Sequence, residues 1–240
     1  CETQLCPAHF PDQKKENSLK KEADKQFFAW VDQEHDGKIY TSATEVTENV
    51  TVSPVFKTQV AKSDKATIGA DDFVIHVTQV GSLDNSESVK RAGAMAFNKK
   101  GETVQKDQIS PNASQLAEIQ AVTEENVLPL SFTAENTSVE IKVQVIATNP
   151  QLVGKTASTL TFDGEPNTEY EIKDADGKVI GTAKTDENGR GVASGLEKGK
   201  KYEISKEGYG KLNTSTSLVD AADIANQFKT NADDQTTHDP

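Results

Sequence analysis

Two short segments carry oxygen-bearing side chains at spacings that could hold a metal ion. They are Asp174-Ala175-Asp176-Gly177 and Asp186-Glu187-Asn188-Gly189. Carboxylate and amide oxygens are the ligands that Ca²⁺ prefers, but neither segment continues to the glutamate at position twelve that an EF-hand loop requires. A glycine after Asp or Asn instead supplies the positive φ of a tight turn. The sequence therefore predicts two hairpin turns, and we expect no metal and no cofactor.

Both cysteines lie near the beginning of the sequence, at Cys1 and Cys6, with His9 close behind. A local disulfide or two unpaired thiols is one interpretation, because the sequence holds no distant cysteine to pair with. A lipid-modified Cys1, as in mature lipoproteins, is a second. Zinc bound by Cys1, Cys6, His9 and His35 is a third, although this spacing matches no compact zinc finger.

Nucleophilic catalysis has little support in the sequence. The four histidines, His9, His35, His76 and His238, fall in different segments. Neither a Gly-x-Ser-x-Gly elbow, nor a His-Glu-x-x-His pair, nor a phosphate-binding glycine loop occurs. The many Asp and Glu residues are most simply a solvated surface. We therefore expect no catalytic residues and no enzymatic activity.

The charge balance narrows the range of partners. With 26 basic and 38 acidic residues, the net charge is −12. Nucleic acids and anionic membrane surfaces are poor partners for such a chain, because phosphate binding needs clustered Lys and Arg. No apolar run approaches the 18 residues of a membrane span, so we expect no membrane insertion. Few aromatic residues and many Thr, Asn and Asp favour small extracellular β-modules, which we expect to be monomeric.

The two predicted turns separate short runs of alternating apolar and polar residues. Tyr170 and Ile172, then Val179, then Val192, then Tyr202 and Ile204 recur at strand period. Such alternation is typical of half-buried antiparallel strands. The pattern predicts a small β-sandwich whose core contains these residues.

This segment also resembles a known family. Its residues 175–189, then Leu196, Gly199 and Tyr202, then Gly208-Tyr209, resemble the B-type repeat of collagen-adhesin and pilin proteins of Gram-positive cell surfaces. The resemblance implies a prealbumin-like sandwich over residues 151–216.

The same resemblance implies an internal Lys–Asn isopeptide bond, for which Lys155 or Lys173 would pair with Asn213. That chemistry needs a buried, neutral lysine and a neighbouring carboxyl group. Lys206 stands where the family has its acid. Glu207 lies one residue further, and one step along a strand points to the opposite face. We therefore expect the crosslink to be missing.

Two further resemblances cover the first part of the chain. Phe27-Phe28-Ala29-Trp30, the Asp36-Gly37 turn and the segment 44–56 resemble the internalin B-repeat over residues 25–58, which implies a small β-grasp-like module. Asp71-Asp72-Phe73 and Leu128–Phe132 resemble a bacterial immunoglobulin-like domain over residues 60–150.

Within the immunoglobulin-like region, residues 66–77 predict one alternating strand with Phe73, Ile75 and Val77 on one face. Val89, Ala92, Ala96 and Phe97 have helical spacing. Residues 115–119 predict a short helical turn, and residues 127–134 and 138–145 predict a hairpin.

These observations predict a mainly β protein built from small modules in series. Its segments are 1–58, a polar stretch with the β-grasp-like module; 59–150, the immunoglobulin-like sandwich; 151–216, the prealbumin-like sandwich; and 217–240, a short helix or linker.

The expected function is a non-catalytic stalk or adhesin segment, outside the cell, of a longer bacterial cell-surface protein that binds an unidentified protein or glycan. The alternatives are a lipid-anchored surface binding protein and an accessory module of a secreted glycan- or wall-acting enzyme.

Overall fold

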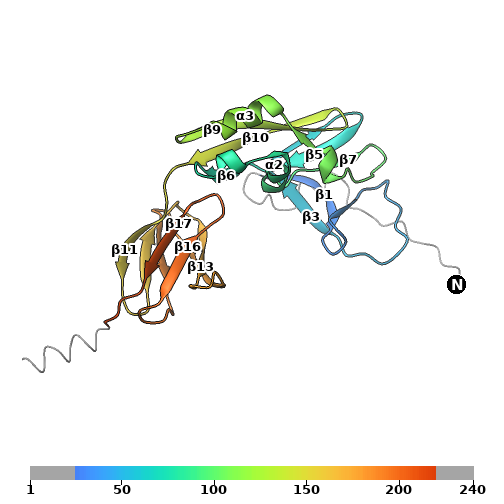
Figure 1. Ribbon diagram of the computed structural model, residues 1–240. Coiled ribbons are helices and arrows are strands. Elements are labelled where there is room, and N and C mark those ends of the chain that lie inside the picture. The colour runs from blue at the N-terminus through green and yellow to red at the C-terminus, as the bar shows by residue number, and fades with distance from the viewer. Residues whose placement is uncertain (1–24, 220–240) are drawn as a thin grey trace, which may run out of the picture. The chain divides into compact units, whose positions relative to one another are not determined.

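The computed structural model describes residues 25–219 and is mainly β, as the sequence predicts (Figure 1). The chain divides into two compact units, unit 1 up to Val145 and unit 2 from Ile146. The predicted boundary between residues 150 and 151 lies close to this division, whereas the predicted boundary between 58 and 59 falls inside unit 1. The two units are described separately below.

Unit 1 begins with a three-stranded antiparallel sheet of order β2-β1-β3. Its strands are β1 (Gln26–Asp32), β2 (Lys38–Tyr40) and β3 (Ser53–Lys57). Asp36 and Gly37 both have positive φ, at 52° and 71°, in the predicted turn between β1 and β2. The aromatic strand, the glycine turn and the closing strand expected between residues 25 and 58 are therefore confirmed.

Two further sheets enclose the main core of unit 1. One has the order β4-β5-β7 and the other the order β6-β10-β9-β8. Two α-helices and two 3₁₀ turns accompany them. The bounds are β4 (Gln59–Lys62), β5 (Ala66–Ala70), β6 (Phe73–His76), η1 (Val80–Ser82), α2 (Asn85–Arg91), β7 (Met95–Asn98), η2 (Lys106–Gln108), β8 (Ser110–Pro111), α3 (Ala113–Gln120), β9 (Asn126–Ala134) and β10 (Thr137–Ile146).

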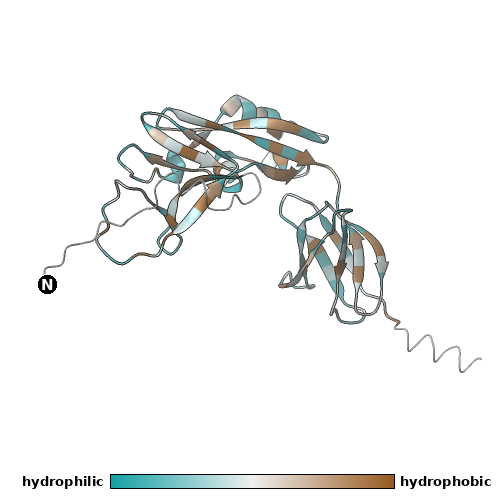
Figure 2. Ribbon diagram, turned by 180° about the vertical axis from the view of Figure 1, so that it is seen from behind, coloured by the Kyte–Doolittle hydropathy of each residue, from teal (hydrophilic) through white to brown (hydrophobic). Residues whose placement is uncertain are grey.

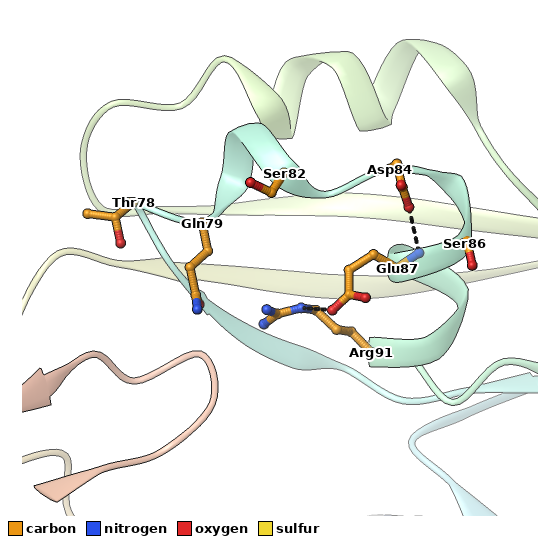
Figure 3. Close-up of a pocket in the computed structure, with 7 residues that line it drawn as sticks. All are labelled: Thr78, Gln79, Ser82, Asp84, Ser86, Glu87 and Arg91. Carbon is orange, nitrogen blue, oxygen red and sulfur yellow. Dashed lines mark hydrogen bonds and ion pairs between the residues drawn. The ribbon is translucent and has the colours of Figure 1, made fainter. Parts of the chain in front are cut away.

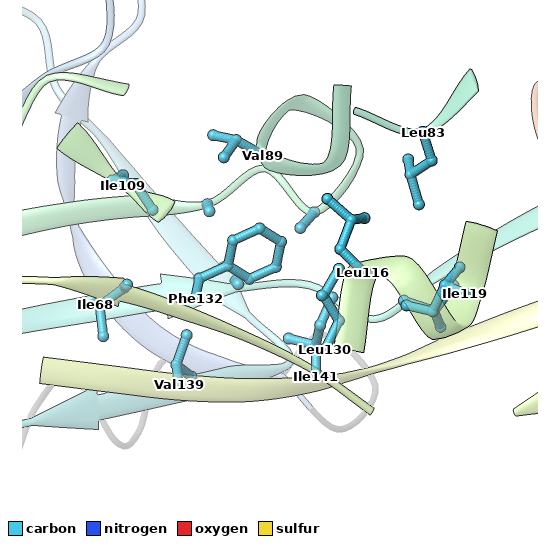
Figure 4. Packing of buried hydrophobic residues seen from close by; sticks show 14 of the residues in the cluster. Ile68, Leu83, Val89, Ile109, Leu116, Ile119, Leu130, Phe132, Val139 and Ile141 are labelled. Atoms are coloured by element: carbon cyan, nitrogen blue, oxygen red, sulfur yellow. The ribbon is translucent and has the colours of Figure 1, made fainter. Parts of the chain in front are cut away.

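The main core lies between these sheets and the two helices (Figure 4). Phe132 of β9 is fully buried, with Ile68 of β5 and Leu116 of α3 in the same cluster. A second cluster links the first sheet to the others, because Phe28 and Val31 of β1 pack with Met95 of β7. Residues 26–57 therefore share a core with the residues that follow them.

The predicted single strand over residues 66–77 is wrong. The chain turns at Asp71-Asp72, so that β5 and β6 belong to different sheets. Side-chain hydrogen bonds fix this corner. Asp71 Oδ1 accepts from the N–H of Thr58 at 2.9 Å, and Asp72 Oδ1 accepts from the N–H of Lys142 at 2.8 Å.

The helices and the final hairpin predicted for unit 1 are confirmed only in part. The helical spacing assigned to residues 89–97 is wrong beyond Arg91, because Gly93, with φ of 50°, ends the helical path and Met95–Asn98 pair as a strand. The short helix near residues 115–119 is confirmed as α3, and the final hairpin is confirmed as β9 and β10.

Unit 2 contains a three-stranded sheet of order β11-β12-β15 and a four-stranded sheet of order β14-β13-β16-β17. Hydrophobic and hydrophilic residues alternate along the strands of both units (Figure 2). The bounds are β11 (Gln151–Lys155), β12 (Leu160–Asp163), β13 (Glu169–Lys173), β14 (Val179–Lys184), β15 (Arg190–Ala193), β16 (Lys201–Ser205) and β17 (Lys211–Ser215).

The core of unit 2 contains most of the residues that the alternation predicts. Tyr170, Ile172, Tyr202 and Ile204 are buried and pack with Phe162. The expected burial of Val179 and Val192 is wrong, because they are 46% and 52% exposed. In β15 the neighbours of Val192 face inward instead. A Cβ on Gly191 would lie only 2.6 Å from Phe162 Cζ, so the Phe162 ring already fills that space.

Candidate functional site

The pocket in unit 1 lies where η1 leads into α2 (Figure 3). Its volume is about 410 Å³, and every residue that lines it is polar: Thr78, Gln79, Ser82, Asp84, Ser86, Glu87 and Arg91. Asp84 Oδ1 accepts from the N–H of Glu87 at 2.8 Å and thereby caps α2. Arg91 Nε donates to Glu87 Oε1 at 3.0 Å, one helical turn away.

The chemistry available to this pocket is hydrogen bonding. Its carboxylates already bond to groups within α2, and neither His nor Cys is among the lining residues. Gln79 Oε1 is buried and has no hydrogen-bond partner within residues 25–219. The exposed side chains of Ser82, Asp84 and Ser86 can form hydrogen bonds with water or with a polar ligand.

A buried ion pair joins β3 to the corner at residue 71. The side chain of Lys57 is 9% exposed, and its Nζ lies 3.3 Å from Asp71 Oδ2. Desolvation by this burial lowers the pKa of Lys57, and the charge of Asp71 opposes part of the shift. The lysine stem packs over Gly69 beside Phe28, where an added Cβ would lie 2.9 Å from Lys57 Cγ. This pair helps to hold the first sheet against the rest of unit 1.

A second charged pair closes the turn after β1. The Asp32 side chain is 2% exposed, and its Oδ2 lies 2.8 Å from His35 Nδ1. Burial of Asp32 acts to raise its pKa, but hydrogen bonds from His35 and from the N–H of Glu34 outweigh it, so the pKa of Asp32 lies below its usual value. The hydrogen bond to Asp32 raises the pKa of His35.

The structure does not place the predicted crosslink residues in a buried cluster. Lys155 ends β11, Asn213 lies in β17, and Glu207 lies in the turn between β16 and β17. All three are exposed, whereas the chemistry needs a lysine shielded from water.

The other lysine named for the crosslink, Lys173, has a different environment. Cross-strand pairing places Lys173 opposite Glu203, and Glu203 opposite Asn213, in one row across three strands. Lys173 Nζ lies 3.9 Å from Glu203 Oε1 and 3.7 Å from Glu171 Oε2. The neighbouring row, which contains Ile172 and Ile204, faces the core, so the Lys173 row faces outward. Sequence reasoning missed Glu203, although its place between two buried residues indicates an outward side chain.

Both calcium-like segments form tight turns, but only the first closes a hairpin, between β13 and β14. The hairpin predicted at Asp186–Gly189 is wrong, because this turn joins β14 to β15 and these strands belong to different sheets. The N–H of Gly177 donates to the carbonyl of Asp174 at 3.0 Å, and the φ of Gly177 is 79°. The carboxylate of Asp174 accepts from the N–H groups of Asp176 and Lys178. Asp186 bonds to its own turn in the same way. These carboxylates therefore stabilise one hairpin turn and one turn between the two sheets.

Several sequence predictions concern residues that the structure does not describe. Cys1, Cys6, His9 and His238 lie outside residues 25–219, as do residues 220–240 of the segment 217–240 that is expected to form a short helix or linker. In the described part, no three His, Cys, Asp or Glu side chains gather as a metal site would need. The same residues include no helix long and apolar enough to cross a membrane.

The terminal strands of unit 2 lie side by side and run in the same direction. Near the beginning of both, the N–H of Lys211 donates to Asn149 Oδ1 at 3.4 Å. Beyond the end of both, the N–H of Ser217 donates to the carbonyl of Thr156 at 2.8 Å. The chain therefore enters unit 2 at one end of this strand pair and leaves at the other end (Figure 1).

Comparison with known proteins identifies no relative: the chain matches no protein-family model and no curated protein.

Proposed function

We propose that this chain is a non-catalytic, extracellular stalk or adhesin segment of a bacterial cell-surface protein. The path of the chain through unit 2 carries the proposal. A stalk module has to pass tension from its first residue to its last, and here the first and last strands are parallel neighbours joined near both ends.

The relative direction of β11 and β17 determines how a pulling force acts on unit 2. Pulling on the incoming and outgoing chain draws β11 and β17 past one another along their length. The two strands belong to different sheets, so the contacts that resist this motion include the two hydrogen bonds near their ends, and pulling loads both of these bonds at the same time. The rate of forced unfolding depends on the barrier to this motion and not on equilibrium stability.

Two other properties support the proposal. The net charge of −12 favours solubility at a cell surface. Each unit also has its own hydrophobic core, as independent modules in series do. Ligand binding, by a protein or a glycan, would use exposed polar surfaces such as the pocket beside α2.

Single-molecule pulling on the full chain tests the mechanical part. In a background with Cys1 and Cys6 replaced by Ser, handles are attached at Gln151→Cys and Leu218→Cys. We expect a markedly higher unfolding force than with handles at Gln151→Cys and Lys211→Cys, which pull one end of the strand pair apart. Equal forces in the two geometries would contradict a tension-bearing role.

A second experiment tests the location. Antibodies raised against unit 2 should label intact cells of the organism that produces the protein. Labelling only after lysis would overturn the cell-surface assignment, whatever the pulling experiment finds.

A further inference from the structure

The four-stranded sheet of unit 2 contains a repeat that composition and turn signals do not reveal. Glu165–Ile172 has the sequence EPNTEYEI, and Glu197–Ile204 has the sequence EKGKKYEI. Four of the eight positions are identical, at an offset of 32 residues. The third position has a positive φ in both copies, 51° at Asn167 and 68° at Gly199.

The strand that follows each copy pairs with it in the same register. Four cross-strand pairs of β13 and β14 correspond one by one to four pairs of β16 and β17. The first set is Glu169 with Lys184, Tyr170 with Ala183, Glu171 with Thr182 and Ile172 with Gly181. The second set is Lys201 with Ser215, Tyr202 with Thr214, Glu203 with Asn213 and Ile204 with Leu212.

The first copy contains a turn held by a tyrosine and a threonine. The N–H of Glu165 donates to Tyr170 Oη at 2.9 Å. Thr185 Oγ1 donates to the carbonyl of Glu165 at 2.5 Å and accepts from the N–H of Thr168 at 2.8 Å. We call this arrangement the first Tyr/Thr turn.

The second copy contains the same three hydrogen bonds. The N–H of Glu197 donates to Tyr202 Oη at 2.9 Å. Thr216 Oγ1 donates to the carbonyl of Glu197 at 2.6 Å and accepts from the N–H of Lys200 at 3.2 Å. This is the second Tyr/Thr turn.

The two copies meet about a local twofold axis. In the pairing of β13 with β16, Ile172 lies opposite Ile204, which is its own equivalent. On either side of this pair, Glu171 pairs with Ser205 and Lys173 pairs with Glu203. Glu203 is the equivalent of Glu171, and Ser205 is the equivalent of Lys173, so a twofold rotation converts one of these pairs into the other. Because β13 and β16 are antiparallel, the two Tyr/Thr turns, which precede these strands, lie at opposite ends of the sheet.

Each Tyr/Thr turn touches the chain at one boundary of unit 2. At the first, Thr148 Oγ1 lies 3.3 Å from Glu165 Oε1, just before β11. At the second, Leu218 lies against Gly199, just after β17, and an added Cβ there would lie 2.7 Å from Leu218 Cδ2.

We propose that the sheet β14-β13-β16-β17 is an internal duplication whose two Tyr/Thr turns hold the chain where it enters and where it leaves unit 2. The duplication stands on sequence, register and hydrogen bonds alone. The role of the turns at the boundaries rests on the proposed stalk function, because only a module in series needs a defined path on both sides.

Exchange of the turns in the full chain tests the duplication. The variant K198P/G199N/K200T/K201E gives the second copy the sequence of the first. We expect unit 2 to stay folded, with a Tm within about 5 °C of the parent protein. Slow hydrogen exchange at residue 200 should persist, since its N–H still donates to Thr216.

A permuted variant is the matched control. K198T/G199P/K200E/K201N introduces the same four residue types out of order and places proline, whose φ is fixed near −65°, where φ is 68°. It should lose the fold of unit 2. Loss of the fold in the exchange variant, or equal stability of the two variants, would overturn the duplication. Neither result would bear on cell-surface location or on unfolding force.

Two glycine substitutions test the contact at the outgoing chain. Gly199→Ala and Gly195→Ala both place a side chain at nearly the same φ, 68° and 69°, so their backbone strain is matched. Only the first adds an atom against Leu218, since nothing lies within 4 Å of a Cβ on Gly195. We expect the methyl NMR signals of Leu218 to shift in Gly199→Ala and to stay in place in Gly195→Ala. Unchanged Leu218 signals in both variants would overturn the boundary contact and leave the duplication standing.

Discussion

The two units differ in the chemistry of their buried bends, although carboxylates also hold the more exposed turns at Asp174 and Asp186 of unit 2. Unit 1 uses titratable side chains: Lys57 with Asp71 at the corner between β5 and β6, and Asp32 with His35 after β1. Unit 2 uses neutral hydroxyl groups in its Tyr/Thr turns, where Thr185 is 2% exposed and Tyr170 is 1% exposed. Charged groups lose more solvation on burial than hydroxyls do, and they depend on a partner of opposite charge.

This difference has consequences for both stability and pH response. Removing one partner of a buried ion pair leaves an uncompensated charge, whereas removing one hydroxyl leaves a neutral peptide group without its bond. Unit 1 should therefore be the more sensitive to single substitutions at its bends, and its stability should respond to pH in a range where the Tyr/Thr turns of unit 2 do not titrate.

The largest effect is expected from Asp71→Ala. It leaves the Lys57 ammonium group in a buried site without its carboxylate, and should destabilise unit 1 by about 3 kcal/mol. Trp30 is the single tryptophan of the chain and lies in β1, so its fluorescence during denaturant unfolding reports on unit 1. The double variant Lys57→Met/Asp71→Ala should recover much of the loss. A loss of the same size in the double variant would show that the charge is not the cause.

A smaller effect is expected from Thr185→Val and from Thr216→Val. Each removes a hydroxyl that bonds to two backbone groups of one Tyr/Thr turn, and should cost unit 2 about 1 to 2 kcal/mol. Hydrogen exchange of residues 165–168 and 197–200 measures the two turns separately. Slower exchange than in the parent, or faster exchange only in unit 1, would contradict the role of the hydroxyl.

Smaller still is the pH response of the Asp32–His35 pair. The pKa of His35 is raised on folding, so its contribution is complete below the unfolded value of 6.5 and is lost as the pH rises through the folded pKa. The pKa of Asp32 is lowered, so its contribution is present above 3.8 and is lost as the pH falls through the folded pKa.

Trp30 fluorescence should therefore report lower stability of unit 1 at pH 9 than at pH 6, and His35→Gln should flatten this dependence. The hydroxyl of Tyr170 has its pKa raised by burial, so unit 2 should lose stability only as the pH rises above 10. If unit 2 lost as much folding stability as unit 1 between pH 6 and pH 9, the proposed difference in pH response between the two units would be wrong.

The smallest effect is expected on the outer surface of unit 2. Asn213→Ala and Lys155→Met change exposed side chains and should alter stability by no more than about 0.5 kcal/mol. Intact mass measurement of the parent protein should equal the mass calculated from its sequence. A mass lower by one ammonia, restored in Asn213→Ala, would show that a crosslink forms.

Much of the local structure could be predicted because it depends on neighbouring residues. Gly177 and Gly189 follow Asp and Asn in turns that close through their own backbone, and β10 of the final hairpin alternates between buried and exposed residues from Thr137 to Val145. The corner at Asp71-Asp72 was missed, although the apolar positions change there from even-numbered residues (66, 68 and 70) to odd-numbered residues (73, 75 and 77). Such a change of phase does not by itself distinguish a bulge within one strand from a corner between two sheets. The partners of this corner, Thr58 and Lys142, lie far away in sequence.

The candidate functional features of unit 2 also depend on contacts between residues that are far apart in sequence. The row that contains Lys173, Glu203 and Asn213 depends on the register of three strands, which no short motif encodes. The Tyr/Thr turns bring together groups 16 to 20 residues apart in sequence, so the short sequence repeat does not reveal the threonines that complete the two turns.

The sequence by itself determined the mainly β class, the positions of the tight turns and the lack of basic clusters for nucleic acid. These depend on residue type, period-two alternation and the conformational freedom of glycine, all of which act over a few residues. Tertiary structure alone decided which charges are buried, which valines face solvent and where the chain enters and leaves unit 2. Those properties depend on contacts between distant segments, because burial and strand register are set by how whole sheets pack against each other.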